Sequence, residues 1–370
     1  MAHPTNTYDC LLIGGGVIGL MTARELLSRG QSVAVIDRSA VGLESSWAGG
    51  GILFPVDPGQ LSQAGMALVT WSRNAYQALA QELFDETGTD SEWAQSGCIV
   101  KDRGQGDAII EWVQSHGLQA SRIGDKELRT LAPALRNKFG DSVWLPDVAQ
   151  IRNPRLLQAL KQSIVQRGGA IFERAPLKSI QIEQGRAVSV QSNDQKFHAD
   201  KIIVSAGAWT TELIKPYGPA PLIEPVRGQM ICFQAQADWV KPILMEGDYY
   251  LIPRNDGRIL AGSTVERVGF DKSTTQQAFD ALRHAAVHML PQLEHVSVEI
   301  HWAGLRPSSP DGVPTIAEHP EIEGLYVNAG HYRNGLVMAP ASARLMAELA
   351  LGQTPTFDPA PYAAHFTSTL

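Results

Sequence analysis

The stretch Gly14-Gly15-Gly16-Val17-Ile18-Gly19 decides the fold of this chain, and it has the pattern G-x-G-x-x-G. The apolar run at 10–13 predicts a buried strand before it, and the pattern at 17–28 predicts a helix that Gly30 ends. A second apolar run at 32–36 predicts another strand. A strand, a helix and a strand in this order predict a βαβ unit and therefore a parallel sheet.

Three glycines of this stretch have separate tasks in a dinucleotide-binding turn. Gly14 permits the tight turn, Gly16 lets the backbone approach a pyrophosphate, and Gly19 lets the helix and strand pack closely. The start of the helix then presents unpaired N–H groups and the positive end of its dipole to the phosphates. Asp37 closes the second strand about 20 residues further on, where an acidic side chain holds the ribose hydroxyls. The agreement of strand, helix and acid predicts a dinucleotide site rather than a simple turn.

The rest of the chain alternates between two patterns. A helix starting at Asn153-Pro154 and strands up to 202–204 repeat the style of the first unit. From 226 to 302 the pattern is antiparallel, and from 324 the α/β style resumes with an Ala-rich helix at 335–351. We therefore expect an α/β fold in which a dinucleotide-binding parallel sheet is interleaved with an antiparallel-sheet substrate domain. The predicted boundaries give residues 1–84, 150–218 and 304–370 to the nucleotide-binding domain, and residues 85–149 and 219–303 to the substrate domain.

The composition is typical of a soluble globular protein and excludes several classes. A length of 370 residues favours two domains, and a net charge of −7 without basic runs argues against a nucleic-acid partner. Three cysteines, far apart and without CxxC spacing, favour a reduced cytoplasmic protein. The first residues show no secretory signal, and the apolar stretch 11–23 is too short and too rich in glycine to span a bilayer. We therefore expect no membrane association.

The segment Glu44-Ser45-Ser46-Trp47-Ala48-Gly49-Gly50-Gly51-Ile52 follows the second strand. Its hydroxyls and exposed amides are suited to hold a second part of a long cofactor. A flexible glycine loop explains the same residues, so the segment alone does not separate NAD from FAD.

Further motifs follow in a fixed order along nearly the whole chain. They are Ala206-Gly207-Ala208-Trp209, Pro225-Val226-Arg227-Gly228-Gln229, Trp302-Ala303-Gly304-Leu305-Arg306-Pro307 and Gly330-His331-Tyr332-Arg333-Asn334-Gly335. Together with the two glycine-rich segments, they resemble the D-amino-acid oxidase family, within it the glycine oxidase branch associated with thiamine thiazole synthesis. The last two motifs are much more specific than the glycine pattern.

The resemblance implies FAD as the cofactor. It places the adenine end at Leu177 and the flavin ring beside the loop that begins at His331, where amides at a helix start stabilise negative charge. Related sarcosine oxidases attach the flavin to a cysteine near the arginine motif, and no cysteine follows Cys232, so we expect noncovalent FAD. The predicted cofactor residues are Gly14, Gly16, Val17, Ile18, Gly19, Asp37, Arg38, Ser45, Ser46, Gly50, Gly51, Ile52, Leu177, His331, Tyr332, Arg333, Asn334, Gly335, Leu336 and Val337.

The resemblance also implies three substrate-binding residues. Arg306 matches the arginine that grips the substrate carboxylate, for which a planar guanidinium is suited. Tyr250 matches a tyrosine that supports the same carboxylate, and its strand neighbour Tyr249 is expected to face the other way. Arg333 matches a second arginine near the flavin and the substrate. At Val265 the family pattern can carry a methionine, and the shorter side chain predicts more room and a weaker preference for glycine.

The implied activity is oxidative deamination of a small amino acid. Glycine, O2 and water would give glyoxylate, ammonia and H2O2 by hydride transfer from the α-carbon to flavin N5. The expected partners are this substrate and O2, and relatives that form tetramers imply a homo-oligomer. No metal is expected, because His284 and His288 on one predicted helix lack a third ligand.

Several alternative functions stay open at this point. The substrate can instead be sarcosine or a small D-amino acid, because the carboxylate clamp would be the same. A dehydrogenase with an acceptor other than oxygen keeps the same fold. A non-catalytic FAD-binding protein and an NAD-dependent dehydrogenase both account for the glycine turn alone.

Overall fold

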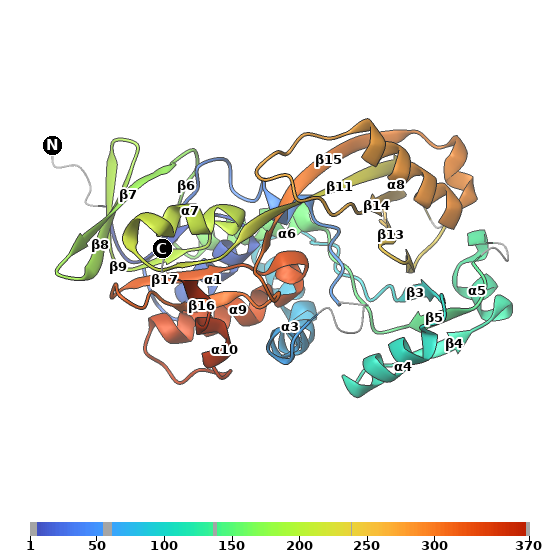
Figure 1. Cartoon of the computed structure of the whole chain (residues 1–370), viewed down its shortest axis with the longest axis horizontal. Coiled ribbons are helices and arrows are strands. Elements are labelled where there is room, and N and C mark those ends of the chain that lie inside the picture. The colour runs from blue at the N-terminus through green and yellow to red at the C-terminus, as the bar shows by residue number, and fades with distance from the viewer. Residues whose placement is uncertain (1–5, 55–60, 136–138, 238, 368–370) are drawn as a thin grey trace.

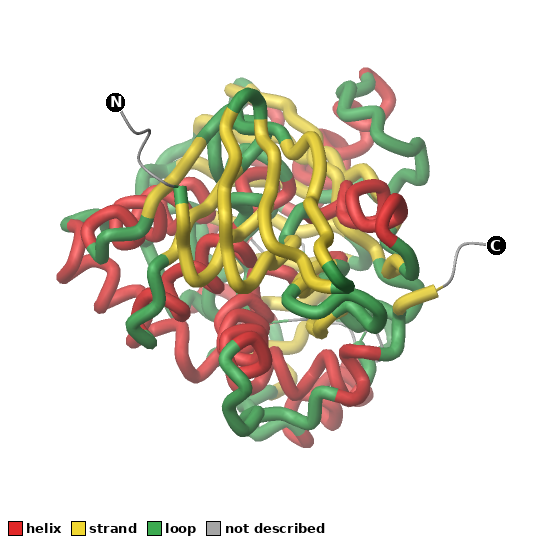
Figure 2. Tube along the Cα trace, turned by 90° about the vertical axis from the view of Figure 1, so that its left-hand side faces the viewer, coloured by secondary structure: helices red, strands yellow, loops and turns green. Residues whose placement is uncertain are grey.

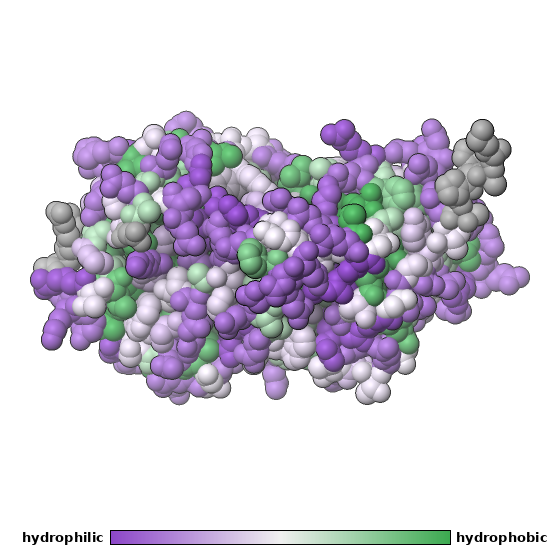
Figure 3. Space-filling model, turned by 180° about the vertical axis from the view of Figure 1, so that it is seen from behind, coloured by the Kyte–Doolittle hydropathy of each residue, from purple (hydrophilic) through white to green (hydrophobic). Residues whose placement is uncertain are grey.

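The computed structural model describes residues 6–54, 61–135, 139–237 and 239–367. In the described part of the chain, no helix is both long and apolar enough to cross a membrane. The face seen from behind is mostly hydrophilic, with hydrophobic residues in small separate areas (Figure 3).

The first sheet is built around the predicted βαβ unit. Five of its strands, β17, β9, β1, β2 and β6, are parallel neighbours, and the edge strand β16 runs antiparallel to β17. The antiparallel strands β7 and β8 extend from β9 and lie at one end of the molecule, facing the viewer in Figure 2. In sheet order the strands are β16 (Thr315–Glu318), β17 (Leu325–Ala329), β9 (Gln195–Val204), β1 (Thr7–Ile13), β2 (Val33–Ile36) and β6 (Ala170–Phe172), with β7 (Leu177–Glu183) and β8 (Arg186–Ser192) beside β9.

The two faces of this sheet are covered by different layers, because side chains alternate along each strand. Cys10 and Leu12 of β1 pack among the helices, whereas Leu11 and Ile13 pack against β7 and β8. Burial on both faces explains why the strand was recognisable as a continuous apolar run. The helical layer consists of α1 (Val17–Ser28), α3 (Gln63–Thr87), α6 (Asn153–Gln166) and α9 (Gly335–Ala350), and α7 (Thr210–Ile214) lies on the other side.

The second sheet lies beside the first (Figure 1) and is antiparallel except between β12 and β3. Helix α8 (Gln276–Met289) covers one of its faces, and the other face looks toward the first sheet. In sheet order its strands are β15 (Val298–Ser308), β11 (Glu224–Gln234), β14 (Arg258–Gly262), β13 (Tyr249–Pro253), β12 (Ile243–Glu246), β3 (Cys98–Lys101), β5 (Ser142–Leu145) and β4 (Ser121–Ile123). The remaining elements are α2 (Ser45–Ala48), α4 (Gly106–Ser115), α5 (Asp125–Leu131), α10 (Ala360–Ala363) and the short pair β10 (Ala220–Pro221) and β18 (Phe366–Thr367).

The expected fold class is confirmed, and helix α1 has the predicted bounds. The division into two domains stays a prediction, and strand β15 runs across its border between residues 303 and 304. The strands of the second sheet come from two stretches, 98–145 and 224–308, which lie on either side of a long return to the first sheet. The sequence analysis assigned no element to the first of these stretches.

A proline inside α9 is compensated by helix α3. Pro340 has no N–H, so the carbonyl of Leu336, four residues earlier, lacks its helical donor. The Tyr76 hydroxyl donates to that carbonyl, and one turn earlier Ser72 Oγ accepts from Ala341 N at 2.9 Å. Both α3 side chains are fully buried. This contact fixes the start of α9 against the helical layer.

We expect Tyr76→Phe to lower the free energy of unfolding by about 1–3 kcal/mol, because it leaves the buried Leu336 carbonyl without a donor. Urea denaturation measures the difference. The control is Tyr8→Phe, whose hydroxyl has no hydrogen bond to other described residues and whose loss is expected to change little. Equal stability of the two variants would contradict the assigned role of Tyr76.

Candidate active site

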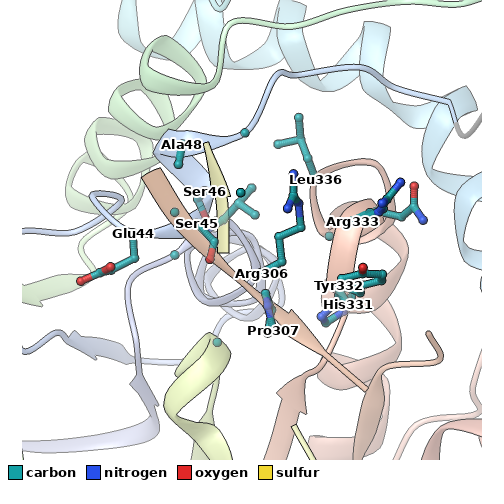
Figure 4. Close-up of a pocket in the computed structure, with 18 of the residues that line it drawn as sticks. Glu44, Ser45, Ser46, Ala48, Arg306, Pro307, His331, Tyr332, Arg333 and Leu336 are labelled. Atoms are coloured by element: carbon teal, nitrogen blue, oxygen red, sulfur yellow. The ribbon is translucent and has the colours of Figure 1, made fainter. Parts of the chain in front are cut away.

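A cavity of about 780 Å³ lies where the two sheets face each other. It runs from the glycine turn after β1, past the α2 segment, to the strands β11, β13 and β15 and the loop before α9. This volume is in the upper part of the range for ligand sites. Arg306 lies between the Ser45–Ser46 turn and the loop His331–Leu336 (Figure 4).

The glycine turn is close-packed in the way its sequence predicts. Gly14 has φ +110° and a Cβ there would lie 2.4 Å from the Ser205 carbonyl oxygen. A Cβ on Gly19 would lie 1.9 Å from the Gly14 carbonyl oxygen, so only glycine lets α1 approach the strand this closely. Asp37 Oδ2 accepts from Gly15 N at 2.7 Å and so ties the end of β2 to the turn.

The segment after β2 is held firmly rather than loosely. Ser45 Oγ donates to the Leu305 carbonyl, and Ser46 Oγ accepts from Val17 N at 2.9 Å at the start of α1. A Cβ on Gly51 would lie 2.0 Å from the Ile151 carbonyl oxygen. These contacts favour a cofactor-binding role for this segment over a flexible loop.

Arg254 and Asn153 fasten the same segment, and the sequence analysis did not assign them to the site. Arg254 is 8% exposed and donates to the Gly50 carbonyl at 2.8 Å and to Gln150 Oε1 at 2.8 Å. Burial lowers the pKa of Arg254 to about 10, so it stays charged at pH 7. Asn153, expected only as a helix cap, instead donates to the Ser46 carbonyl at 2.7 Å. An arginine that follows a strand has no sequence signal for burial, because its acceptors come from distant segments.

Arg306 lies on the cavity face of β15 and is held in place by acceptors beyond β14. Its Nη2 donates to Ser263 Oγ at 2.7 Å, and its Nη1 donates to the Thr264 carbonyl at 3.0 Å. Gly228 on β11 makes room for it, since a Cβ there would come within 2.2 Å of Nη1. Burial lowers the pKa of Arg306, and the neighbouring Tyr250 opposes that shift. The guanidinium has five N–H donors, so charged donors remain for a carboxylate.

The two adjacent tyrosines of β13 point to opposite faces, as expected. Tyr250 lines the cavity, and its ring packs over Gly262, where a Cβ would lie 2.7 Å from the ring. Tyr249 packs in the cluster beneath α8. Only one of the pair therefore reaches the site.

Arg333 is exposed at the edge of the cavity and lies 5.7 Å from the centre of the Tyr332 ring. It is near enough to Arg306 for its charge to lower the pKa of that residue. No acidic partner lies within ion-pair distance of Arg333 in the part of the chain that the structure describes.

The expectation about Val265 is wrong. Its side chain is 45% exposed and does not line the cavity. Strand β14 ends at Gly262, and beyond it only separate hydrogen bonds, from Thr264 to Gln229 and between Glu266 and Arg227, tie the described backbone to β11. The size of residue 265 therefore does not set the room for a substrate, and a weaker glycine preference does not follow from it.

The loop before α9 brings a helix start to the cavity. Asn334, Gly335 and Leu336 line the cavity, and no side chain caps the start of this helix. Its free N–H groups and the positive end of its dipole favour negative charge nearby. His331 is buried and pairs with Ser342 Oγ at 2.9 Å, and burial lowers its pKa to about 3. His331 is therefore neutral at pH 7.

The structure brings the predicted site residues to this one cavity, with two exceptions. Gly19 lies against the turn rather than at the cavity wall, and Val337 is 2% exposed in the core. The cavity is lined by Gly14, Gly16, Val17, Ile18, Asp37, Arg38, Ser45, Ser46, Gly50, Gly51, Ile52, Leu177, Tyr250, Arg306, His331, Tyr332, Arg333, Asn334, Gly335 and Leu336. Among the described residues, no group of three or more His, Cys, Asp or Glu side chains is arranged to hold a metal.

Comparison with known proteins gives consistent matches over nearly the whole chain. A family model described as FAD dependent oxidoreductase matches residues 9–349. The chain is 42% identical over 354 residues to a glycine oxidase of Pseudomonas aeruginosa. The alignment covers 95% of this chain and 97% of that protein. The crystal structure of glycine oxidase from Geobacillus kaustophilus matches with a TM-score of 0.91 and 28% identity over 97% of this chain and 98% of that one. A bifunctional protein ThiO/ThiG of Nostoc sp. is 30% identical over 94% of this chain and 53% of its own length.

The chain therefore belongs to the family of FAD-dependent oxidoreductases, and FAD is its cofactor. Within that family it is similar to glycine oxidases from end to end.

The residues of the cavity fit this cofactor. Ser205 Oγ and Asn153 Oδ1 are buried at its wall without a hydrogen-bond partner among the described residues. Gly16 places no side chain over the start of α1, where Ser46 Oγ accepts from the first amide, Val17 N. Unpaired polar atoms and free helix amides are what a long polar cofactor with a pyrophosphate needs.

We expect Gly19→Ala to abolish FAD binding, because the new Cβ would overlap the Gly14 carbonyl and push α1 away from the turn. The measurement is the ratio of flavin to protein absorbance after purification. Gly30→Ala is the matched control, since Gly30 follows the same helix with φ +79° and has nothing within 4 Å of an added Cβ. It is expected to cost about 1 kcal/mol of stability and to keep FAD. Full FAD content in both variants would contradict the close approach.

We expect His331 to make the protein less stable in acid. Its folded pKa of about 3 lies below the ordinary value of 6.5, so below pH 6.5 only the unfolded chain takes up a proton at this site. The free energy of unfolding should therefore fall as the pH falls toward 3, by up to about 1.4 kcal/mol per pH unit from this group.

The test compares urea denaturation of the wild type, His331→Asn and His284→Asn between about pH 6.5 and about pH 4.5. His284 is exposed and serves as the control. The dependence on pH should be weaker only in His331→Asn. An unchanged slope in that variant would rule out the neutral buried histidine.

Proposed function

We propose that this protein is an FAD-dependent oxidase of small amino acids, with glycine as its main substrate. The observation that carries the proposal is the half-buried Arg306 with Tyr250 as its neighbour, in the part of the cavity where α9 begins. Glycine oxidases that match nearly the whole chain support the same substrate. In the net reaction, glycine, O2 and water give glyoxylate, ammonia and H2O2.

The proposed task of the site residues is to orient the substrate. Arg306 would bind the carboxylate through two parallel charge-assisted hydrogen bonds, and the Tyr250 hydroxyl would support it. Bound FAD supplies the acceptor of the hydride, at flavin N5. With the carboxylate fixed, the α-carbon has one allowed position, and such orientation accounts for much of a rate enhancement. Arg333 would add positive charge at the edge of the cavity.

The proposal assigns the predicted residues along the cavity to parts of FAD. The glycine turn and the start of α1 would hold the pyrophosphate, and Asp37 the ribose. Leu177 would lie at the adenine end, and the loop from His331 at the flavin ring. Cys10, Cys98 and Cys232 are buried away from the cavity, which supports a noncovalent cofactor.

Three finer points belong to the proposal. The match to a ThiO/ThiG protein supports a role of the product in thiamine synthesis. A homo-oligomer is proposed on the family likeness alone. Sarcosine and small D-amino acids are secondary substrates in this scheme, because they present the same carboxylate to Arg306.

The decisive experiment combines substrates with one variant. Under air, glycine should bleach the bound flavin and yield H2O2, with sarcosine and D-alanine slower. Arg306→Ala should keep FAD and lose about 100-fold or more in kcat/KM for glycine, because the buried carboxylate contact is lost. Flavin absorbance, stopped-flow bleaching and a peroxide assay provide these values.

Arg129→Ala is the control, since Arg129 lies exposed on α5. It should retain full activity. Unchanged bleaching in Arg306→Ala would refute the clamp. Faster turnover of D-alanine would reassign the main substrate, and bleaching without peroxide would indicate a dehydrogenase.

A further inference from the structure

The segment Ser263–Ser273 lies between β14 and α8 and contacts two parts of the cavity wall, at Arg306 and at Glu44 and Trp209. It is partly exposed, and Val265, Val268 and Phe270 are between 41% and 45% exposed. A segment with this exposure has few apolar contacts to hold it. Polar contacts therefore carry much of what holds it in position.

The first residues of the segment hold the proposed substrate clamp. Ser263 Oγ and the Thr264 carbonyl accept the two hydrogen bonds from Arg306 at 2.7 and 3.0 Å. Any shift of this part of the segment would move the guanidinium with it.

The last residues of the segment reach another part of the cavity wall, formed by Glu44, Arg38 and Trp209. The Phe270 ring stacks on Trp209 with centroids 5.6 Å apart, and Lys272 Nζ lies 3.1 Å from Glu44. The guanidinium of Arg38 lies 3.6 Å from the centre of the same Trp209 ring. Glu44, Arg38 and Trp209 line the cavity where the ribose of the cofactor is expected.

A single buried guanidinium connects the two halves of the segment. Arg227 on β11 is 4% exposed, and its Nη2 lies 2.6 Å from Glu266 Oε2. Its Nη1 donates to Asp271 Oδ2 at 2.6 Å and to the Ser273 carbonyl at 3.0 Å. Backbone hydrogen bonds between Arg227 and Glu266 in both directions, at 2.8 and 2.9 Å, reinforce the first contact.

Glu266 transmits this contact to the clamp. Its Oε1 accepts from the Thr264 hydroxyl at 2.5 Å and from Gln229 Nε2 at 2.8 Å. The residue whose carbonyl holds Arg306 is thus fixed through Glu266 by Arg227. Breaking a buried charge pair on one side leaves the other charge uncompensated, so the arrangement is sensitive to Arg227.

We propose that Arg227 is a positioning residue that sets the substrate clamp at Arg306 and the Glu44–Trp209 wall of the FAD cavity together, through the segment Ser263–Ser273. The part that concerns the clamp rests on the proposed function. The part that concerns FAD does not.

The first test is Arg227→Met in the FAD-loaded protein. The KM for glycine should rise about tenfold or more with kcat within about threefold, and FAD should dissociate about tenfold faster. FAD release is followed by the recovery of flavin fluorescence on dilution, without any substrate. Arg227→Lys keeps the charge but not the fork that contacts both carboxylates, so it should restore only part of either effect.

Two further variants each remove one contact of the segment. They test the proposal even if Arg227→Met does not fold. Glu266→Gln should raise the KM and leave FAD release nearly unchanged. Lys272→Ala should speed FAD release and leave the KM nearly unchanged. The control is Arg267→Ala, an exposed residue of the same segment whose acidic partner among the described residues is Glu224, and it should change neither quantity.

Wild-type KM and wild-type FAD release in a folded Arg227→Met variant would overturn the proposal. It would also be overturned if Glu266→Gln and Lys272→Ala each changed both quantities equally, because a general loosening would then explain the data. If the wild type did not oxidise glycine, the proposed function would fail while the FAD release test still decided the role of Arg227.

Discussion

A guanidinium that is partly removed from water is costly to keep, and the surroundings of the half-buried Arg306 are arranged to meet that cost. Removing a charge from water carries a penalty of several kcal/mol unless hydrogen bonds replace the lost hydration. The hydroxyl of Ser263 and the carbonyl of Thr264 supply two acceptors, and Gly228 supplies the space. Burial still lowers the pKa of Arg306, so its remaining donors lack full compensation and favour an incoming anion.

The same cavity needs close backbone contacts at its other end. Gly19 against Gly14 and Gly51 against Ile151 leave no room for a side chain, so the walls are largely main chain. Main-chain amides at the start of α1 and α9 offer donors that cannot be lost by rotation of a side chain. Fixed main-chain donors therefore suit a long cofactor along its length. Side chains that can change conformation lie where the substrate is expected to bind.

The sequence predicted those parts of the structure whose causes are local. The bounds of α1 followed from glycines on both sides of an apolar pattern, and strand alternation predicted that Tyr250 and Tyr249 point to opposite faces. Strands of three or four residues such as β3, β4 and β5 have too few alternations to stand out. Arg254 gave no sign of burial, because its acceptors lie about a hundred or more residues earlier in the chain and meet it only after folding.

Helix α3 is a different case, since Ser62 caps its start and Gly88 ends it with a left-handed conformation. Those signals are local and the capping rules could have found the helix, but the sequence analysis assigned no element to residues 63–87. The error at Val265 has a tertiary cause, because the position follows the end of β14, where strand alternation no longer fixes the direction of a side chain.

Strand β11 serves two purposes because its side chains alternate. Gly228 and Met230 face the cavity, whereas Arg227 and Gln229 face the segment Ser263–Ser273. The space for Arg306 and the contacts that hold its acceptors are therefore encoded in adjacent positions of one motif. A shift of one residue in the pairing of β11 with β15 would exchange the two faces, placing a glycine where the charge network needs a guanidinium and an arginine where Arg306 needs space. The constraint on register is thus stronger than the hydrophobic pattern alone would impose, and it ties the geometry of the substrate end to the pairing of two strands.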